Sequence, residues 1–411
     1  MISVVFVIIA FLIPPLGIPL GLIGIYSERN RWKEYAFIIA LGFASFAYCY
    51  EALTASDIVR YFSYIENIKH VSFHRMFTYG SYGSSGLFVF NAVCWIAGKL
   101  EDPRIVPAVS IFIVYYVSIY MTCYVSKTMQ SKNRSLMISL LFVLTALNFY
   151  ALTNNVRNVL ALVLIGYATF RDCYEKKRNV WTYVLYILPI FIHTSAILIL
   201  ALRIVVILSE RLKWIALGLV VLVHPVLVFL HPYTRNMKGR ILSYIGNAIN
   251  KAYRYYTNSH SSWGLIVQAS TSEKLFKILY VIICLVLGAV ILLMLTHKDL
   301  LIPKGVSRVL SMVYYIDLVM ILTIPMMIPI YWRFSAAVIA MSGAGLLMFE
   351  KFSIRKEFFS IARLACCVMG VCAMLLWVRN LVLYSDYLRM FTSAFISSPV
   401  IVLARDLIHL L

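Results

Sequence analysis

Long apolar runs separated by short polar segments recur along the whole chain. The runs are 2–26, 34–54, 105–124, 135–153, 157–171, 180–192, 194–209, 214–231, 274–296, 309–331, 333–349 and 363–384. A helix that crosses a bilayer needs about 20 apolar residues, and helices satisfy their own backbone polar groups in lipid. The pattern therefore predicts an all-α, polytopic transmembrane helical protein with about 12 spans (roughly 10 to 14), built as a single integral membrane domain over residues 1–411. The stretch 180–209 fits either two short helices or one long tilted helix.

Composition supports a membrane protein. Hydrophobic residues make up 62% of the chain and charged residues 13%, and the mean hydropathy is +0.87. A soluble protein of this length cannot hide so much apolar surface. The first run contains Pro14 and Pro15 and lacks a basic leader, which indicates an uncleaved first span. The eight cysteines show no CxxC pair and no zinc spacing, so we expect small buried side chains and no metal site.

The basic residues of the short loops fall on one side of the predicted membrane domain. If 84–98 lies on the membrane surface and does not cross, the loops near 29–33, 127–134, 171–178, 211–213, 298–308 and 351–363 share that side. The positive-inside rule makes it cytoplasmic. Two large loops, 55–104 with its interfacial helix and 232–273, then lie on the outer side.

The second outer loop is basic, although topology does not require positive charge there. It carries Arg235, Arg240 and Arg254 among several tyrosines. Arginine binds phosphate oxygens bidentately, and aromatic rings offer flat apolar faces on which sugars can stack. The alternative is an amphipathic surface helix on anionic lipid headgroups. The formal net charge of +20 would indicate nucleic acid in a soluble protein, but here we expect no nucleic-acid partner.

Two arginines begin apolar runs at outer turns. Arg157 follows Thr153-Asn154-Asn155, and Arg333 follows Tyr331-Trp332. An arginine directed into hydrocarbon is costly, so each should face a cavity or the water boundary. The alternative is a snorkelling side chain. If both face one outward cavity, they form a clamp for pyrophosphate.

Three further residues offer acid–base chemistry. His193 lies within an apolar stretch, where it is either a general base or a packed, hydrogen-bonded histidine. His260 is a weaker candidate. Asp57, Arg60 and Tyr61 share one helical face, where Asp57 activates a hydroxyl or forms a local ion pair that caps a helix.

Several familiar motifs are absent from the sequence. It contains no Asp-x-Asp, no Walker A, no GxGxxG, no Gly-x-Ser-x-Gly and no HExxH. Metal-dependent and ATP-driven chemistry is therefore disfavoured, and we expect no cofactor. A donor that already carries a good leaving group, such as a lipid pyrophosphate, needs only positioning, charge stabilisation and a base.

The order of these motifs resembles that of a known family. Asp57-x-x-Arg60-Tyr61, Val156-Arg157-Asn158-Val159-Leu160-Ala161, Phe191-Ile192-His193-Thr194-Ser195-Ala196 and Trp332-Arg333-Phe334 are similar, over roughly residues 50–340, to the Wzy-type O-antigen and exopolysaccharide polymerases, especially the EpsG-like branch. Asn158 departs from the glutamine usual in that branch.

The resemblance implies a metal-independent glycosyltransferase with a GT-C-like fold in the bacterial inner membrane, with its active site facing the periplasm. Its substrate would be an undecaprenyl-pyrophosphate-linked oligosaccharide, and membrane lipids, a chain-length regulator and a flippase would be its partners. Arg157 and Arg333, helped by Arg60, Tyr61 and the arginines of the second loop, would hold the donor. His193 or Asp57 would deprotonate the acceptor. An O-antigen ligase and a lipid-linked oligosaccharide flippase are the alternatives; a membrane acyltransferase fits less well.

Overall fold

The computed structural model describes residues 2–52, 56–79, 87–222, 226, 229–236, 242, 246, 249–250, 253, 271–296, 301–323, 331–352 and 356–396. Within these residues the regular structure is helical, apart from one isolated antiparallel bridge between Ala52 and Ser385. The all-α prediction is therefore confirmed for the described part of the chain.

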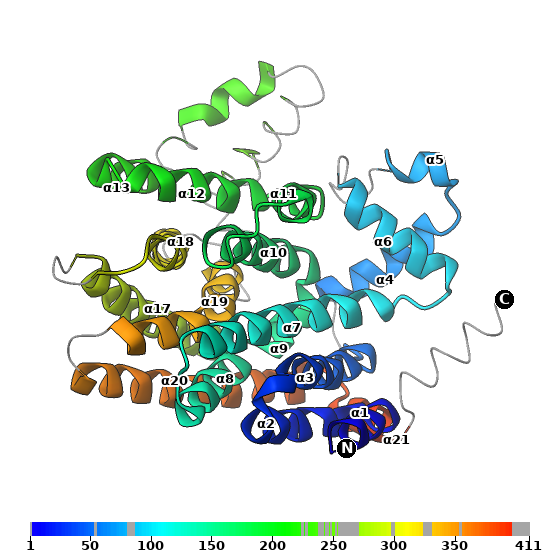
Figure 1. Cartoon of the computed structure of the whole chain (residues 1–411). Coiled ribbons are helices and arrows are strands. Elements are labelled where there is room, and N and C mark those ends of the chain that lie inside the picture. The colour runs from blue at the N-terminus through cyan, green and yellow to red at the C-terminus, as the bar shows by residue number, and fades with distance from the viewer. Residues whose placement is uncertain are drawn as a thin grey trace.

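The helices cover the predicted apolar runs wholly or in part, and four more lie outside them, at 57–68, 73–76, 88–99 and 387–396 (Figure 1). They are α1 (Ile2–Leu12), α2 (Gly17–Ser27), α3 (Trp32–Tyr48), α4 (Asp57–Ile68), α5 (Phe73–Met76), α6 (Phe88–Lys99), α7 (Ile105–Thr128), α8 (Asn133–Ala146), α9 (Phe149–Asn154), α10 (Val156–Cys173), α11 (Val180–Ile187), α12 (Ala196–Ser209), α13 (Lys213–Val221), α17 (Thr271–Thr296), α18 (Lys304–Leu322), α19 (Tyr331–Phe352), α20 (Lys356–Tyr384) and α21 (Tyr387–Ile396). Short 3-10 helices are η1 (Pro14–Leu16), η2 (Arg29–Arg31), η4 (Leu188–Phe191) and η5 (His231–Asn236).

Five of the described helices are long and apolar enough to cross a membrane: α7, α17, α18, α19 and α20. The chain is thus a helical protein with several membrane-spanning candidates, and the count of about 12 crossings stays a prediction.

Several predicted spans are interrupted. The run 2–26 breaks at η1, because a proline inside a helix removes a backbone hydrogen bond and clashes with the preceding turn. The stretch 180–209 forms two α-helices, α11 and α12, with the 3-10 helix η4 between them.

A polar side chain marks another interruption. The run 135–153 divides after Ala146, where Leu147 is extended and Asn148 caps α9 by accepting a hydrogen bond from the Ala151 N–H at 2.9 Å. An asparagine at a helix N-cap satisfies a backbone donor that has no partner within the helix, so it favours a new helix start. Tyr280 of α17 donates to the Ala146 carbonyl at 2.8 Å and satisfies the broken end of α8.

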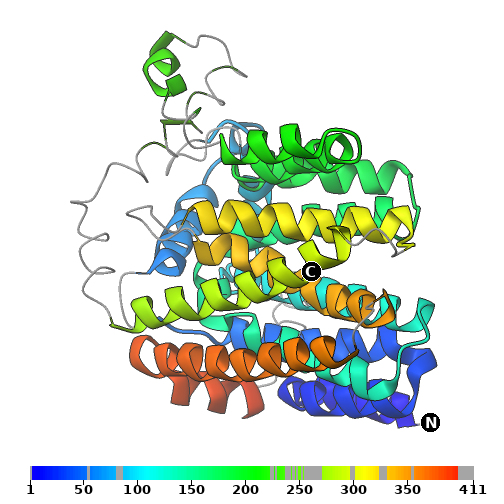
Figure 2. The same cartoon turned by 90° about the vertical axis from the view of Figure 1, so that its left-hand side faces the viewer.

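The core of the bundle lies around α7 and α19. α7 packs against α3, α10 and α19, and α19 is almost entirely enclosed by its neighbours. α20 is the opposite case, because it exposes apolar side chains three or four residues apart, at Ile361, Leu364, Val368, Val371 and Leu375. Figure 2 shows α20 along the outside of the bundle. An apolar stripe of this kind on the surface of a membrane protein is the face that meets lipid.

The pair α2–α3 packs through a glycine seam. Gly17, Gly21 and Gly24 follow one face of α2, and a Cβ at Gly21 would fall 2.8 Å from the Tyr35 carbonyl oxygen of α3. Small residues spaced in this way let two helix backbones approach closely, which is a common basis of helix association in membranes.

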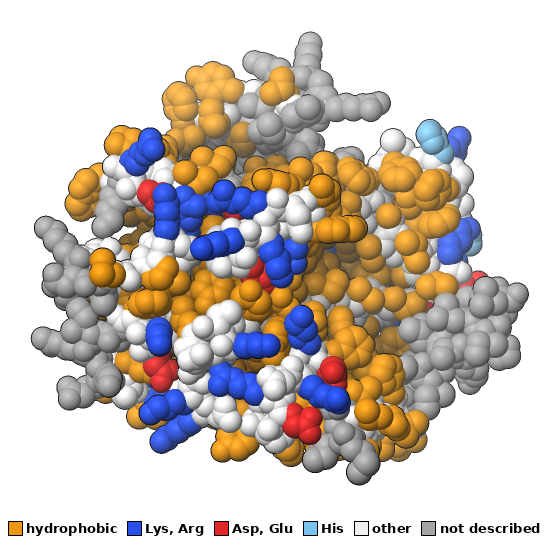
Figure 3. All heavy atoms as spheres, viewed as in Figure 1, with side chains coloured by type: hydrophobic (Ala, Val, Ile, Leu, Met, Phe, Trp, Pro, Cys, Tyr) orange, Lys and Arg blue, Asp and Glu red, His pale blue; other side chains and the backbone are white. Residues whose placement is uncertain are grey.

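The short basic loops meet at one end of the bundle, which we call the basic end. Contacts join neighbouring loops: Arg29 to Ser131, Thr128 to Tyr174, Glu210 to Arg308, and Ser135 to Glu350. Figure 3 shows lysine and arginine side chains gathered on this face. The structure thus groups the basic loops as the sequence predicts. α10 runs from this end to the other, with Arg171 in its last turn and Arg157 in its first.

Candidate functional site

Helices α4, α5 and α6 form a small unit within the first predicted outer loop, away from the basic end. Tyr64 of α4 donates to Asn91 Oδ1 of α6 at 2.8 Å, and Asn91 donates to the carbonyls of Met76 and Tyr79 at 3.2 and 3.0 Å. α6 has 12 residues, so its length is about 18 Å against a hydrocarbon core of about 30 Å. A helix of this length is too short to cross by itself, and the interfacial position expected for 84–98 stays a prediction.

Arg157 lies against this unit. Its Nε donates to the Tyr61 hydroxyl at 3.2 Å, and its guanidinium carbon lies 5.1 Å from the centre of the Tyr61 ring and 5.0 Å from that of Phe90. Both contacts have cation–π geometry, which stabilises a partly desolvated arginine modestly. Among the residues that the structure describes, no carboxylate lies within ion-pair distance of Arg157. The positive charge of Arg157 therefore meets a hydroxyl and two aromatic rings.

Arg333 and Asp57 belong to the same electrostatic neighbourhood. Burial raises the pKa of the Tyr61 phenol, the positive charges of Arg157 and Arg333 act in the opposite direction, and the charge of Asp57 adds to the rise. Arg333 lies in the first turn of α19, which packs against α10. The structure thus brings Arg157, Arg333 and Asp57 within electrostatic reach of one tyrosine.

Asp57 and Arg60 form the local ion pair considered above. Arg60 Nη1 lies 3.4 Å from Asp57 Oδ1, one helical turn away in α4, and the Arg60 side chain is 48% exposed. Asp57 occupies the first turn of α4, where a carboxylate interacts favourably with the helix dipole. An exposed pair of this kind is weak, so Asp57 can exchange Arg60 for another partner at little cost.

His193 has a hydrogen-bonding role that the sequence does not reveal. Its Nδ1 accepts the backbone N–H of Ser195 at 3.1 Å, and the single hydroxyl proton of Ser195 can be donated either to this Nδ1 at 2.7 Å or to Asn158 Oδ1 at 3.2 Å. A backbone N–H can only donate, so Nδ1 must be unprotonated. The neutral ring therefore carries its proton on Nε2.

Helix α6 connects the surroundings of His193 with those of Arg157. Phe88 of α6 lies 4.3 Å, ring centre to ring centre, from Phe191, two residues before His193. Phe90 of the same helix contacts Arg157. On the other side, Asn158, which bonds Ser195, follows Arg157 directly in α10. The two candidate residues are thus joined through α6 and through α10.

The second loop contributes less to the described site. Arg235 lies in η5, and its side chain is outside the described part. Arg240, Arg254 and His260 lie wholly outside the described residues. The described residues contain no group of three His, Cys, Asp or Glu side chains placed to hold a metal ion.

Three contributing residues were not predicted as site residues: Phe90, Asn158 and Ser195. Asn158 and Ser195 stand in the motifs that carry the family resemblance, so their neighbours Arg157 and His193 were the available signal. Phe90 had no such signal, because an aromatic residue in an apolar helix is ordinary.

We found no match to the chain among family models, curated proteins or solved structures.

Proposed function

We propose that this chain is a metal-independent glycosyltransferase that polymerises oligosaccharides carried on a lipid pyrophosphate. The observation that carries the proposal is Arg157, a partly buried cation that has aromatic partners and no carboxylate among the described residues. The motif order shared with Wzy-type polymerases supports the same class, including a bacterial inner membrane location and an outward-facing site.

An anionic ligand would compensate the charge of Arg157. Leaving a desolvated charge without a counter-charge is costly, and a protein that retains one gains from a ligand of opposite sign. Arg157 also stands in the first turn of α10, where backbone N–H groups have no intrahelical acceptor and the helix dipole favours an anion. A pyrophosphate fits this setting, since its oxygens accept the bidentate hydrogen bonds of arginine. Arg333 adds a second positive charge.

In the proposed step, the hydroxyl of the acceptor sugar attacks the anomeric carbon of the donor. A new carbon–oxygen bond forms, the bond between that carbon and the phosphate oxygen breaks, and the lipid pyrophosphate leaves with the electron pair. Arg157 and Arg333 stabilise the charge that develops on the leaving group. Such stabilisation accelerates the reaction because it is stronger in the transition state than in the ground state.

The hydrogen bonds of His193 help to decide whether His193 or Asp57 acts as the general base. With Nδ1 accepting the Ser195 N–H, neutral His193 carries its proton on Nε2 and can act there only as a hydrogen-bond donor. We therefore assign His193 to the phosphate oxygens and Asp57 to the acceptor proton, because Asp57 is a carboxylate at the rim of the same neighbourhood.

The test is a gel of surface glycan from a deletion strain, restored with the wild-type gene or with a variant. Wild type should restore a ladder of chain lengths, whereas Arg157→Gln should leave core plus one repeat unit. Arg178→Gln is the matched control: Arg178 lies at the basic end with its side chain 61% exposed and 2.8 Å from Asp172. It should restore the ladder.

Other outcomes would overturn the proposal. Loss of every glycan-bearing band in the deletion strain would indicate a ligase or a flippase. An unchanged ladder would remove the chain from polysaccharide synthesis. A full ladder with Arg157→Gln would show that this arginine does not hold the donor.

A further inference from the structure

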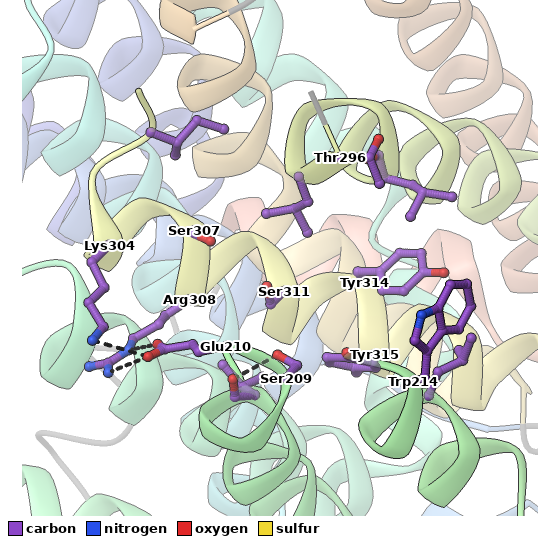
Figure 4. Close-up of a pocket in the computed structure, with 15 residues that line it drawn as sticks. Ser209, Glu210, Trp214, Thr296, Lys304, Ser307, Arg308, Ser311, Tyr314 and Tyr315 are labelled. Atoms are coloured by element: carbon purple, nitrogen blue, oxygen red, sulfur yellow. Dashed lines mark hydrogen bonds and ion pairs between the residues drawn. The ribbon is translucent and has the colours of Figure 1, made fainter. Parts of the chain in front are cut away.

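A cavity of about 550 Å³ lies at the basic end, between α12, α13, α17 and α18. Figure 4 shows α18 along it, with residues of α12 and α13 on one side and of α17 on the other. Its size is in the range of small-molecule sites. It belongs to the end of the bundle opposite Arg157, so it is separate from the candidate site described above.

One part of this cavity is positively charged. Glu210 lies 2.5 Å from Arg308 and 3.1 Å from Lys304, so two cations share one carboxylate (Figure 4). The Lys304 side chain is 70% exposed, and Ser307 and Ser311 line the cavity beside it. The excess of one positive charge, with hydroxyl groups nearby, suits a single phosphodiester.

The remaining walls are mainly apolar, with the hydroxyl groups of Ser209 and Thr296 among them, and continue onto the outer surface. Leu217 and Leu295 line the cavity, and Leu292 lines it while remaining 43% exposed. Beside them, Trp214 is 84% exposed. Tryptophan is enriched where a membrane protein meets the headgroup layer, and exposed leucines on the neighbouring helices face hydrocarbon.

We infer that this cavity binds an anionic membrane phospholipid, with its phosphodiester at Lys304 and Arg308 and one acyl chain along Leu217, Leu292 and Leu295. A soluble phosphate compound would use the charged part alone and leave the apolar walls without a partner. A lipid fills both, because it joins a charged headgroup to an apolar chain. The juxtaposition of the two surfaces therefore favours a lipid.

The experiment is native mass spectrometry of the purified, delipidated full-length protein. Phosphatidylglycerol and phosphatidylcholine with identical acyl chains are titrated separately. The wild-type protein should retain phosphatidylglycerol more strongly. Since a basic residue near an anionic surface contributes about 1 kcal/mol, Lys304→Gln should weaken phosphatidylglycerol binding about fivefold and leave phosphatidylcholine unchanged.

A matched control exists at the same end. Arg178 is exposed like Lys304, and each shares a carboxylate with a second arginine: Asp172 with Arg203, and Glu210 with Arg308. Arg178→Gln should leave lipid binding unchanged. Leu292→Trp, which fills the apolar wall from an exposed position, should reduce binding of both lipids. Thermal unfolding of each variant separates lost binding from lost folding.

Three results would overturn the inference. Equal binding of the two lipids would remove the role of charge. An equal loss with Arg178→Gln would indicate general surface attraction. Displacement of phosphatidylglycerol by millimolar glycerol 3-phosphate would identify a soluble phosphate compound as the ligand in place of a lipid.

Discussion

The arginines at the two ends of the bundle differ in whether a carboxylate lies beside them. At the basic end, buried Arg203 lies 2.5 Å from Asp172, and Arg308 lies 2.5 Å from Glu210. At the other end, Arg157 contacts only the Tyr61 hydroxyl and aromatic rings among the described residues. A buried cation with a carboxylate partner belongs to the folded structure, because removing either partner leaves the other uncompensated. A cation without one is available to a ligand.

The largest effect should come from Arg157→Gln. If Arg157 stabilises charge on the leaving group, the rate of transfer from a lipid-pyrophosphate donor should fall roughly 100- to 1,000-fold, as for loss of one transition-state donor. Stability should be unchanged or higher, because a partly desolvated charge disappears. Initial rates and thermal unfolding in detergent measure the two quantities. A variant that loses activity only in proportion to its loss of folded protein would contradict this account.

Arg203→Gln should have the opposite effects: it should lower stability and leave activity per folded molecule unchanged. It leaves Asp172 with the exposed Arg178 and a hydrogen bond from Tyr186 at 3.5 Å, so the free energy of unfolding should fall by about 3 kcal/mol. Activity per folded molecule should persist. Unfolding can be followed with a thiol-reactive dye, since Cys94, Cys123 and Cys284 are buried in the folded protein. Adding Asp172→Asn should recover part of the loss; no recovery would mean that the pair is not what stabilises this end.

Tyr61→Phe should sharpen the comparison further. It removes the hydroxyl that bonds Arg157 and keeps the ring, so donor affinity should change by about 1 kcal/mol, or about fivefold. Tyr64→Phe is the control, because the Tyr64 hydroxyl bonds Asn91 within the α4–α6 unit. It should lower stability and leave affinity unchanged. Titration of a pyrophosphate-lipid analogue distinguishes the two variants.

The smallest effect should be a pH dependence at the basic end. The hydrogen bond from Arg308 lowers the pKa of Glu210, so Glu210 binds protons more readily in the unfolded chain. Its stabilising contribution is present at neutral pH and is lost as the pH falls through the lowered pKa. Wild type should therefore lose slightly more stability than Glu210→Gln on acidification, by less than about 1 kcal/mol. Parallel unfolding curves of the two proteins between neutral and acidic pH would contradict it.

The positions of the helices and the grouping of the basic loops follow from the sequence, because both depend on hydrophobicity and charge. The points at which the predicted spans are interrupted depend on particular contacts. Leu147 and Asn148 stand in an apolar run, and only the cap on Ala151 and the bond from Tyr280 show that α8 ends there. α21 lies beyond the last predicted span, 363–384, where no helix was predicted. It is a helix because Phe391 packs against Phe46 of α3, a contact about 345 residues apart in sequence.

In the candidate site too, some residues could be chosen from the sequence, whereas their contacts are known only from the structure. Arg157, His193 and Asp57 could be chosen from residue type and position. Tyr61 could be chosen as well, but its contact with Arg157 could not, and Phe90 could not be chosen at all, since both reach Arg157 from helices that precede it by more than 60 residues. The hydrogen bond from the Ser195 N–H to His193 depends on the local backbone, which the sequence leaves open.

The glycine seam between α2 and α3 bears on the order in which the protein is made. Both helices lie within residues 17–48, whereas Arg157 and Arg333 are synthesised much later. Because the contacts of Gly21 and Gly24 come from Tyr35 and Ile39 of α3, the seam can close while the ribosome is still translating α7. The N-terminal helix pair would then be assembled before the helices of the candidate site are synthesised.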